Sequence, residues 1–187
     1  TVKQMDKRGE ELGIAEAKIN ADAVNAADTK LKLGEMADLM KNFTPSAVAP
    51  LRAQFLSFKN VFPGLDEKEI QEAGSMEGFS KLAIQLAANA TRQLGAREAA
   101  QVFTKMQQSL PATGMSQGGL NQIMGFMNQA ADVQITKATA AEDWKKTHAQ
   151  SLEGFEPNWN LQSKGKLKDI TQLATNIANG AGTQQMS

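Results

Sequence analysis

Apolar residues recur at every seventh position along the first part of the chain. Met5, Leu12, Ile19, Ala26, Leu33 and Met40 form this series, and no Pro interrupts it. A seven-residue repeat places its members on one side of a helix. The neighbouring positions that would complete a coiled-coil seam include polar residues such as Arg8, Asp22 and Lys30. We therefore predict an extended N-terminal helical arm over residues 1–44 that lies on another surface, with a two-stranded coiled coil as the alternative.

The middle segment, residues 45–110, begins with an aromatic helix face. Leu51, Phe55, Phe58 and Phe62 follow one another at spacings of four, three and four residues, which aligns them on one side of a helix. Pro63 and Gly64 end this helix. We interpret the face as core packing, with an exposed docking surface as the alternative. An acidic run over residues 65–73 predicts a short solvated helix, because its carboxylates lack the spacing of a calcium loop.

Two further long helices are expected after this segment. Apolar positions from Phe79 to Met106 predict one amphipathic helix over residues 79–108, in which Gly95 permits a bend. Pro111 and nearby glycines mark a linker, and Ser116 is the expected N-cap of the next long helix. That helix runs through Met124, Met127 and Trp144, and we interpret its Met residues as core, with recognition of a partner helix as the alternative.

The last part of segment 111–187 holds shorter elements. We expect a turn over residues 154–160, a short helix over 167–178 and a disordered tail from residue 180. The predicted class is thus an all-α, elongated protein with three long helices and shorter connecting helices.

Composition limits the core that these helices can form. The apolar share is 41%, but Ala supplies much of it, aromatic residues make up 5%, and Tyr is absent. Ala favours helix yet buries little area per residue. We therefore expect neighbouring subunits to complete the fold. The chain opens with Thr1, so we read it as a processed product, a fragment or the ordered part of a longer protein, and we find neither a membrane span nor a secretory signal.

Charge and residue types exclude several function classes. Twenty basic and twenty acidic residues give a net charge of zero, so no global field attracts nucleic acid, and Lys164, Lys166 and Lys168 form the only basic cluster. There is no Cys, and His148 is the only His, which excludes thiolate chemistry and sites that need two histidines. We expect His148 to stabilise a helix C-terminus.

Two carboxylates, Glu153 and Glu156, flank Phe155 and lie near Trp159 in the sequence. Such a pair is a weak match to a glycosidase site. The phosphate-binding and nucleophile-elbow motifs are missing. We predict no catalytic, cofactor-binding or metal-ligating residues, and no enzymatic activity.

Residues 78–160 resemble a protein group through three motifs. These are Gln93-Leu94-Gly95-Ala96-Arg97-Glu98-Ala99-Ala100, Ser116-x-x-Gly119-Leu120 and Phe155-x-x-x-Trp159-Asn160. They resemble the C-terminal helical region of virion proteins of tailed bacteriophages and prophages. The resemblance implies a structural or internal, ejection-type component of a phage particle, present in many copies and packed against the portal or tail.

The expected partners are therefore further copies of this chain or other virion proteins, with membrane contact during genome delivery and no specific nucleic-acid site. The side chains that we expect to pack against partners are Met5, Leu12, Ile19, Leu33, Met40, Phe55, Phe58, Phe62, Met124, Met127, Trp144 and Trp159. Two alternatives are the non-catalytic helical part of a phage peptidoglycan hydrolase and a membrane-active helical protein used in genome delivery.

Overall fold

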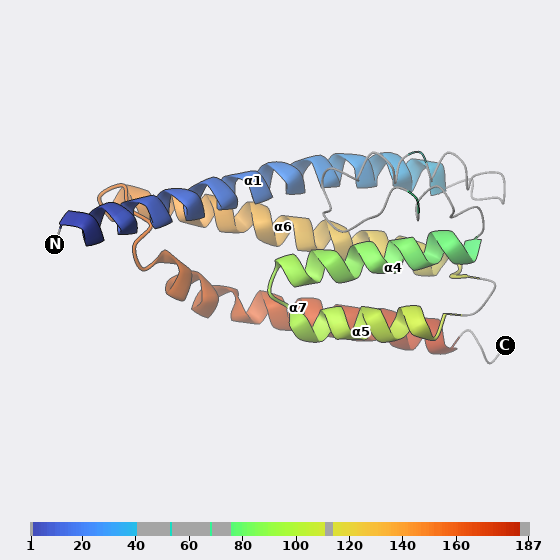
Figure 1. Ribbon diagram of the computed structural model, residues 1–187. Helices are drawn as coiled ribbons and strands as arrows, with labels where there is room; N and C mark the ends of the chain where they lie inside the picture. Colours follow the sequence, from blue (N-terminus) through green and yellow to red (C-terminus); the bar gives the residue numbers. More distant parts are fainter. Residues whose placement is uncertain (1, 41–52, 54–67, 69–75, 111–113, 184–187) are drawn as a thin grey trace.

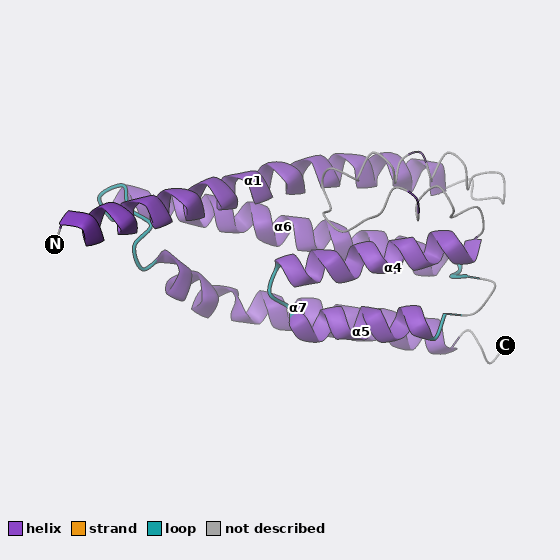
Figure 2. Ribbon diagram, viewed as in Figure 1, coloured by secondary structure: helices purple, strands orange, loops and turns teal. Residues whose placement is uncertain are grey.

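The computed structural model describes residues 2–40, 53, 68, 76–110 and 114–183. Its helices are α1 (Val2–Met40), α4 (Met76–Gln93), α5 (Arg97–Gln108), α6 (Gln117–Thr147) and α7 (Phe155–Thr183). No strand occurs among these residues (Figure 2). The all-α class predicted from the sequence is therefore confirmed, and α1, α6 and α7 are the long helices.

Four of the helices enclose a core, and the fifth lies on the outside. α4 packs against α5 and α6, and α7 packs against the same two helices, so that α4, α5, α7 and α6 form a four-helix bundle. α1 packs along α6 and runs in the opposite direction (Figure 1). The elements align along one direction, which gives the molecule its elongated shape.

Large apolar side chains from all four bundle helices meet in this core. The fully buried ones include Phe79, Leu86, Phe103 and Phe126, and the rings of Phe103 and Phe126 pack edge to face with centroids 4.7 Å apart. Burial of each such side chain contributes roughly 1.5–3 kcal/mol. The core contains residues from the predicted segments 45–110 and 111–187, and Ile19 and Leu33 of α1 belong to the same cluster.

The single helix predicted over residues 79–108 is wrong, because the chain reverses at Gly95. α4 ends at Gln93, and Gly95 adopts a φ of 76°, which a residue without a side chain reaches at little cost. The Ala96 N–H donates to the Thr91 carbonyl at 2.9 Å, and the Gly95 N–H donates to the Arg92 carbonyl at 3.0 Å. This pair of bonds is a Schellman motif, which ends a helix and turns the chain back.

The predicted N-cap of α6 is confirmed. Ser116 has extended backbone angles, and its hydroxyl accepts a hydrogen bond from the Gly119 N–H at 3.1 Å. The cap satisfies one of the backbone donors that a helix N-terminus leaves unpaired. The preceding residue is held as well, because the Met115 N–H donates to the buried Ser80 hydroxyl at 2.9 Å.

The turn predicted over residues 154–160 is wrong from residue 155 onward, and the helix predicted over 167–178 is present but is part of a much longer one. One helix, α7, occupies Phe155–Thr183, and it includes the start of the predicted disordered tail. Pro157, which is typical of turns, stands in the first turn of α7, where a backbone N–H needs no intrahelical acceptor. Gly154, with a φ of 77°, makes the turn just before the helix.

Some predictions lie outside the described residues. These are the aromatic face of Phe55, Phe58 and Phe62, the acidic helix over 65–73, and the tail beyond residue 183. Met40 belongs to α1, but its side chain is not described.

Candidate assembly surface

α1 has two apolar faces, and only one of them packs against other helices that the structure describes. The seven-residue series predicted from the sequence points inward, where Ile19, Ala26 and Leu33 are buried. The opposite side carries seven residues at alternating spacings of four and three, all of them exposed: Gly13, Ala17, Asn20, Val24, Ala27, Leu31 and Gly34. We call these seven residues the outer face.

The outer face has the spacing of a coiled-coil seam. Its residues occupy two alternating positions of a heptad, and such positions meet a second helix in knobs-into-holes packing. Val24 and Leu31 are its largest side chains, and they remain 69% and 66% exposed. Glu10 takes the place before Gly13 in the series, so a charged residue bounds the face at its N-terminal end.

Ion pairs with α6 determine which side of α1 faces outward. Lys145 of α6 binds Glu16, and Lys30 of α1 binds Asp132 of α6. The hydrogen bond from Lys145 to Glu16, supported by a second one to Glu142, raises the pKa of Lys145 above its ordinary value of 10.5. Because these bonds flank the inner series, they fix the rotation of α1 about its axis.

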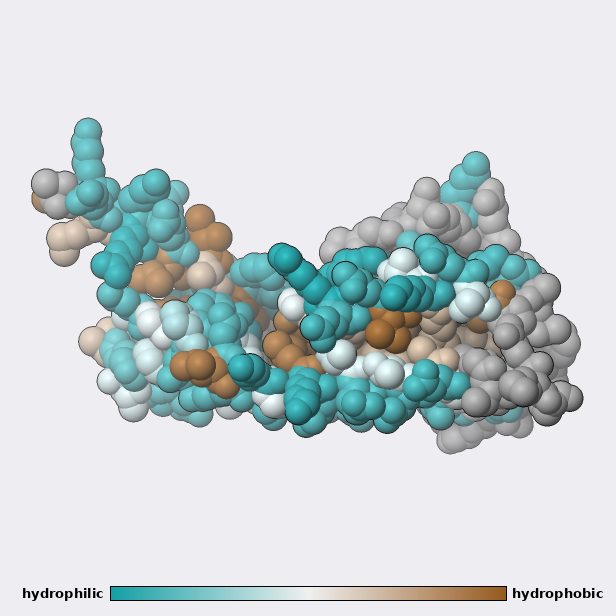
Figure 3. Space-filling model, turned by 90° about the horizontal axis from the view of Figure 1, so that it is seen from below, coloured by the Kyte–Doolittle hydropathy of each residue, from teal (hydrophilic) through white to brown (hydrophobic). Residues whose placement is uncertain are grey.

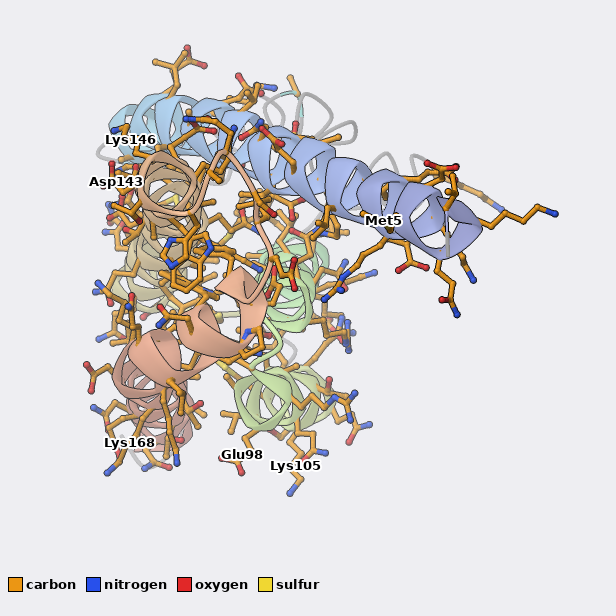
Figure 4. The ribbon with its side chains drawn as sticks, turned by 90° about the vertical axis from the view of Figure 1, so that its left-hand side faces the viewer. Met5, Glu98, Lys105, Asp143, Lys146 and Lys168 are labelled. Atoms are coloured by element: carbon orange, nitrogen blue, oxygen red, sulfur yellow. The ribbon has the colours of Figure 1, made fainter. Side chains whose placement is uncertain are left out.

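The N-terminal end of α1 stands out from the bundle. Figures 3 and 4 show this end projecting away from the other helices, and Met5 lies on the projecting part with 75% of its surface exposed. One ion pair reaches this region, between Arg8 and Glu153 of the segment that joins α6 to α7, at 2.6 Å. On the face seen in Figure 3, apolar side chains elsewhere form small patches among polar ones.

The other residues predicted to contact partners are distributed between core and surface. Five of them are buried in the core of the chain itself, namely Ile19, Leu33, Met124, Met127 and Trp159. Leu12 and Trp144 are half-buried against that core. Among the described residues of the predicted set, Met5 is thus the one that is largely exposed.

The predicted carboxylate pair at the start of α7 is held in separate ion pairs. Glu153 binds Arg8, and Glu156 binds Lys137 of α6 at 2.7 Å. His148 follows the last residue of α6, as expected, and its ring stacks on Trp144 with centroids 3.7 Å apart. The three lysines at 164, 166 and 168 are exposed along α7, and Lys168 points outward in Figure 4.

A pocket of about 280 Å³ lies between α1, α6, α7 and the end of α4. Its charged lining residues form two ion pairs, Lys18 with Asp22 at 2.6 Å and Lys137 with Glu156 at 2.7 Å. Each charged side chain that lines the pocket is therefore paired with another one, within α1 or between α6 and α7. In the described residues no group of three His, Asp or Glu side chains is placed to hold a metal ion, and none of the described helices has an apolar stretch long enough to cross a bilayer.

The sequence carried a signal for the outer face that we did not use. The seven-residue series from Met5 defines the inner stripe of the helix, and the positions directly beside that stripe do not include the outer face. A search for any alternation of four and three among small and apolar residues would have identified residues 13–34.

No protein-family model, curated protein or solved structure matches this chain. The functional inference therefore rests on the exposed outer face of α1. It also rests on the burial or ion pairing of the other candidate residues within the chain.

Proposed function

We propose that this chain is a non-enzymatic structural protein that assembles in more than one copy through the outer face of α1. The observation that carries the proposal is the exposed heptad spacing of residues 13–34, with Val24 and Leu31 largely exposed. An apolar seam on a helix that is already anchored on its other side is typical of an assembly surface, because its burial needs a second helix.

The internal contacts of the other candidate side chains support the same proposal. Glu153 and Glu156, the one carboxylate pair considered for catalysis, are each bound by a basic side chain from a different helix. Five of the apolar residues first considered for partner contact fill the internal core instead. Among the described residues, the outer face and the projecting end at Met5 are two surfaces that carry exposed large apolar side chains and that a partner could cover.

The resemblance of residues 78–160 to tailed-phage virion proteins supports a phage particle as the place of this assembly. Within such a particle, the outer face would join copies of the chain, and the projecting end of α1 would contact a neighbouring portal or tail protein. The proposed role is structural or internal, of the ejection type.

Self-association is tested by sedimentation equilibrium of the chain and of two variants. We expect the wild type to show a mass of at least two 20.1 kDa chains. A double variant, Val24→Glu and Leu31→Glu, should sediment as a single chain, because charges placed in an apolar seam must be desolvated. The matched control is Leu161→Glu on α7, where the side chain is 77% exposed outside α1, and it should associate like the wild type.

A wild-type chain that stays monomeric at its highest soluble concentration would contradict self-assembly. The phage part of the proposal is tested separately, by mass spectrometry of purified particles from a host that produces the chain. We expect the chain among the abundant particle proteins. Its absence from particles would contradict the virion role and leave self-association standing.

A further inference from the structure

We infer that the partner of the outer face is a second copy of this chain, and that the two α1 helices pair antiparallel, with Leu31 of each copy facing Gly13 of the other. This inference rests on the proposed function and names its partner and geometry. It follows from the sizes and the charges of the residues on and beside the outer face.

Side-chain size favours the antiparallel arrangement. With Leu31 facing Gly13 of the second copy, Val24 faces Asn20 and Ala17 faces Ala27. Each large residue then meets a smaller one, so the two helix axes keep a constant separation along the seam. A parallel pairing would place Leu31 on Leu31 and Val24 on Val24, between glycine pairs at residues 13 and 34, so the separation of the helix axes would vary along the seam.

Charges beside the seam favour the same register. Two rows of residues flank the seam of each helix. In an antiparallel pair, each row lies beside the equivalent row of the second helix. Glu16 then lies near Lys30 of the second copy, and Lys7 lies near Glu35. By two-fold symmetry each contact occurs twice, which gives four attractive pairs. In a parallel pair the attractive contacts are reduced to two, each between Lys30 of one copy and Glu35 of the other.

The contacts between α1 and α6 extend this charge pattern into each bundle. Lys30 is bound to Asp132 and Glu16 to Lys145 within one copy. In the pair, Lys30 of one copy and Glu16 of the other would join these bonds into a continuous row of alternating charges. Such a network positions the two copies as well as attracting them.

Disulfide trapping tests the orientation without background, because the chain contains no Cys. Two single variants are made, Ala17→Cys and Ala27→Cys, both at exposed positions of the outer face. In the inferred register these two residues face each other across the pair, whereas two copies of residue 17 lie about 15 Å apart along the axis. A disulfide needs Cα atoms within about 7 Å.

Mild oxidation of the mixed variants should therefore give a disulfide-linked dimer that contains one chain of each kind. Each variant oxidised by itself should stay unlinked, and so should Leu161→Cys on α7. Linked dimers of Ala17→Cys alone would overturn the antiparallel orientation while leaving self-assembly intact. An associated wild type with no linked product from the mixture would overturn the register, and a monomeric wild type would defeat both proposals.

A charge swap provides a second measurement. Glu35→Lys should weaken association on the order of threefold for each pair lost, since exposed ion pairs contribute little individually. Adding Lys7→Glu should restore the affinity, because these two residues face each other in the antiparallel pair. Failure of Lys7→Glu to rescue the variant would contradict the register, since a parallel pair brings Glu35 to Lys30 instead.

Discussion

Trp144 joins α6 to the start of α7 by a hydrogen bond from its indole Nε1 to the carbonyl oxygen of Glu153, at 3.1 Å. The same indole stacks on His148 and packs against Phe155. We predict that Trp144→Phe lowers the free energy of unfolding by about 1–2 kcal/mol, since it keeps an aromatic ring but loses the bond and some buried area. Urea denaturation followed by circular dichroism measures the loss.

His148→Ala removes the ring stack on Trp144 together with the hydrogen bond between His148 Nδ1 and the Trp144 carbonyl oxygen, and it leaves the indole bond to Glu153 in place. An aromatic stack contributes about 0.5–1.5 kcal/mol, so this variant should be affected less than Trp144→Phe. A Trp144→Phe variant as stable as the wild type at the same protein concentration would show that the indole bond does not hold the α6–α7 connection.

Glu16 and Lys145 link α1 to α6, and their bond makes stability depend on pH. Because the bond to Glu16 raises the pKa of Lys145 in the folded chain, the stabilisation is fully present below the ordinary value of 10.5 and is lost as the pH rises through the raised value. We predict that Glu16→Gln destabilises the protein at neutral pH and that its difference from the wild type shrinks above pH 10.5. Thermal unfolding across this pH range measures the effect.

The matched control is Asp143→Asn. Asp143 binds Lys146 within α6 at 2.7 Å, and this bond raises the pKa of Lys146 in the same direction. Figure 4 shows both residues near the end of α6, and their bond lies within this one helix. A loss of stability equal to that of Glu16→Gln would mean that local helix charge, and not the link to α1, explains the effect.

Ser163 places a hydroxyl inside the bundle without a hydrogen-bond partner. Ser163 is 1% exposed, and its Oγ has neither a donor nor an acceptor among the residues that the structure describes. We predict that Ser163→Ala raises the free energy of unfolding by about 1 kcal/mol, because it removes a desolvated polar group and favours helix. Chemical denaturation of the two proteins measures the gain.

Ser80→Ala is the opposite case on α4. The Ser80 hydroxyl is equally buried but accepts the Met115 N–H at 2.9 Å. Its removal leaves that donor unpaired and should cost about 1–3 kcal/mol. Two serine variants that change stability in the same direction would contradict the distinction between a paired and an unpaired hydroxyl.

The fold was predictable where local rules decide it. The long helix at the start of the chain followed from its seven-residue apolar series, and the Ser116 cap followed from a polar residue placed before an apolar run. The reversal at Gly95 was not predictable, because the apolar pattern continues across it and a glycine within a helix is also tolerated. The start of α7 was not predictable for a related reason, because a proline such as Pro157 is found both after the end of helices and in their first turn.

The outer face was harder to predict than the fold. Residues such as Ala17 and Ala27 are good helix formers anywhere, so their spacing becomes informative only once the opposite side of α1 is known to be occupied. That occupation depends on α6, which lies about a hundred residues further along the chain. Periodicity identifies faces of a helix, but tertiary contacts decide which face is left for a partner.

Because one end of α1 projects from the bundle, its backbone amides differ widely in how well they are protected from hydrogen exchange. Around Ile19 and Leu33 the backbone amides share the cooperative unit of α6, so their exchange with deuterated water requires a large opening. Before Arg8, little but the helix itself restrains the chain, and exchange there requires only the fraying of a helix terminus. A neighbouring protein that binds this end would therefore be revealed first by slowed exchange in the opening turns of α1.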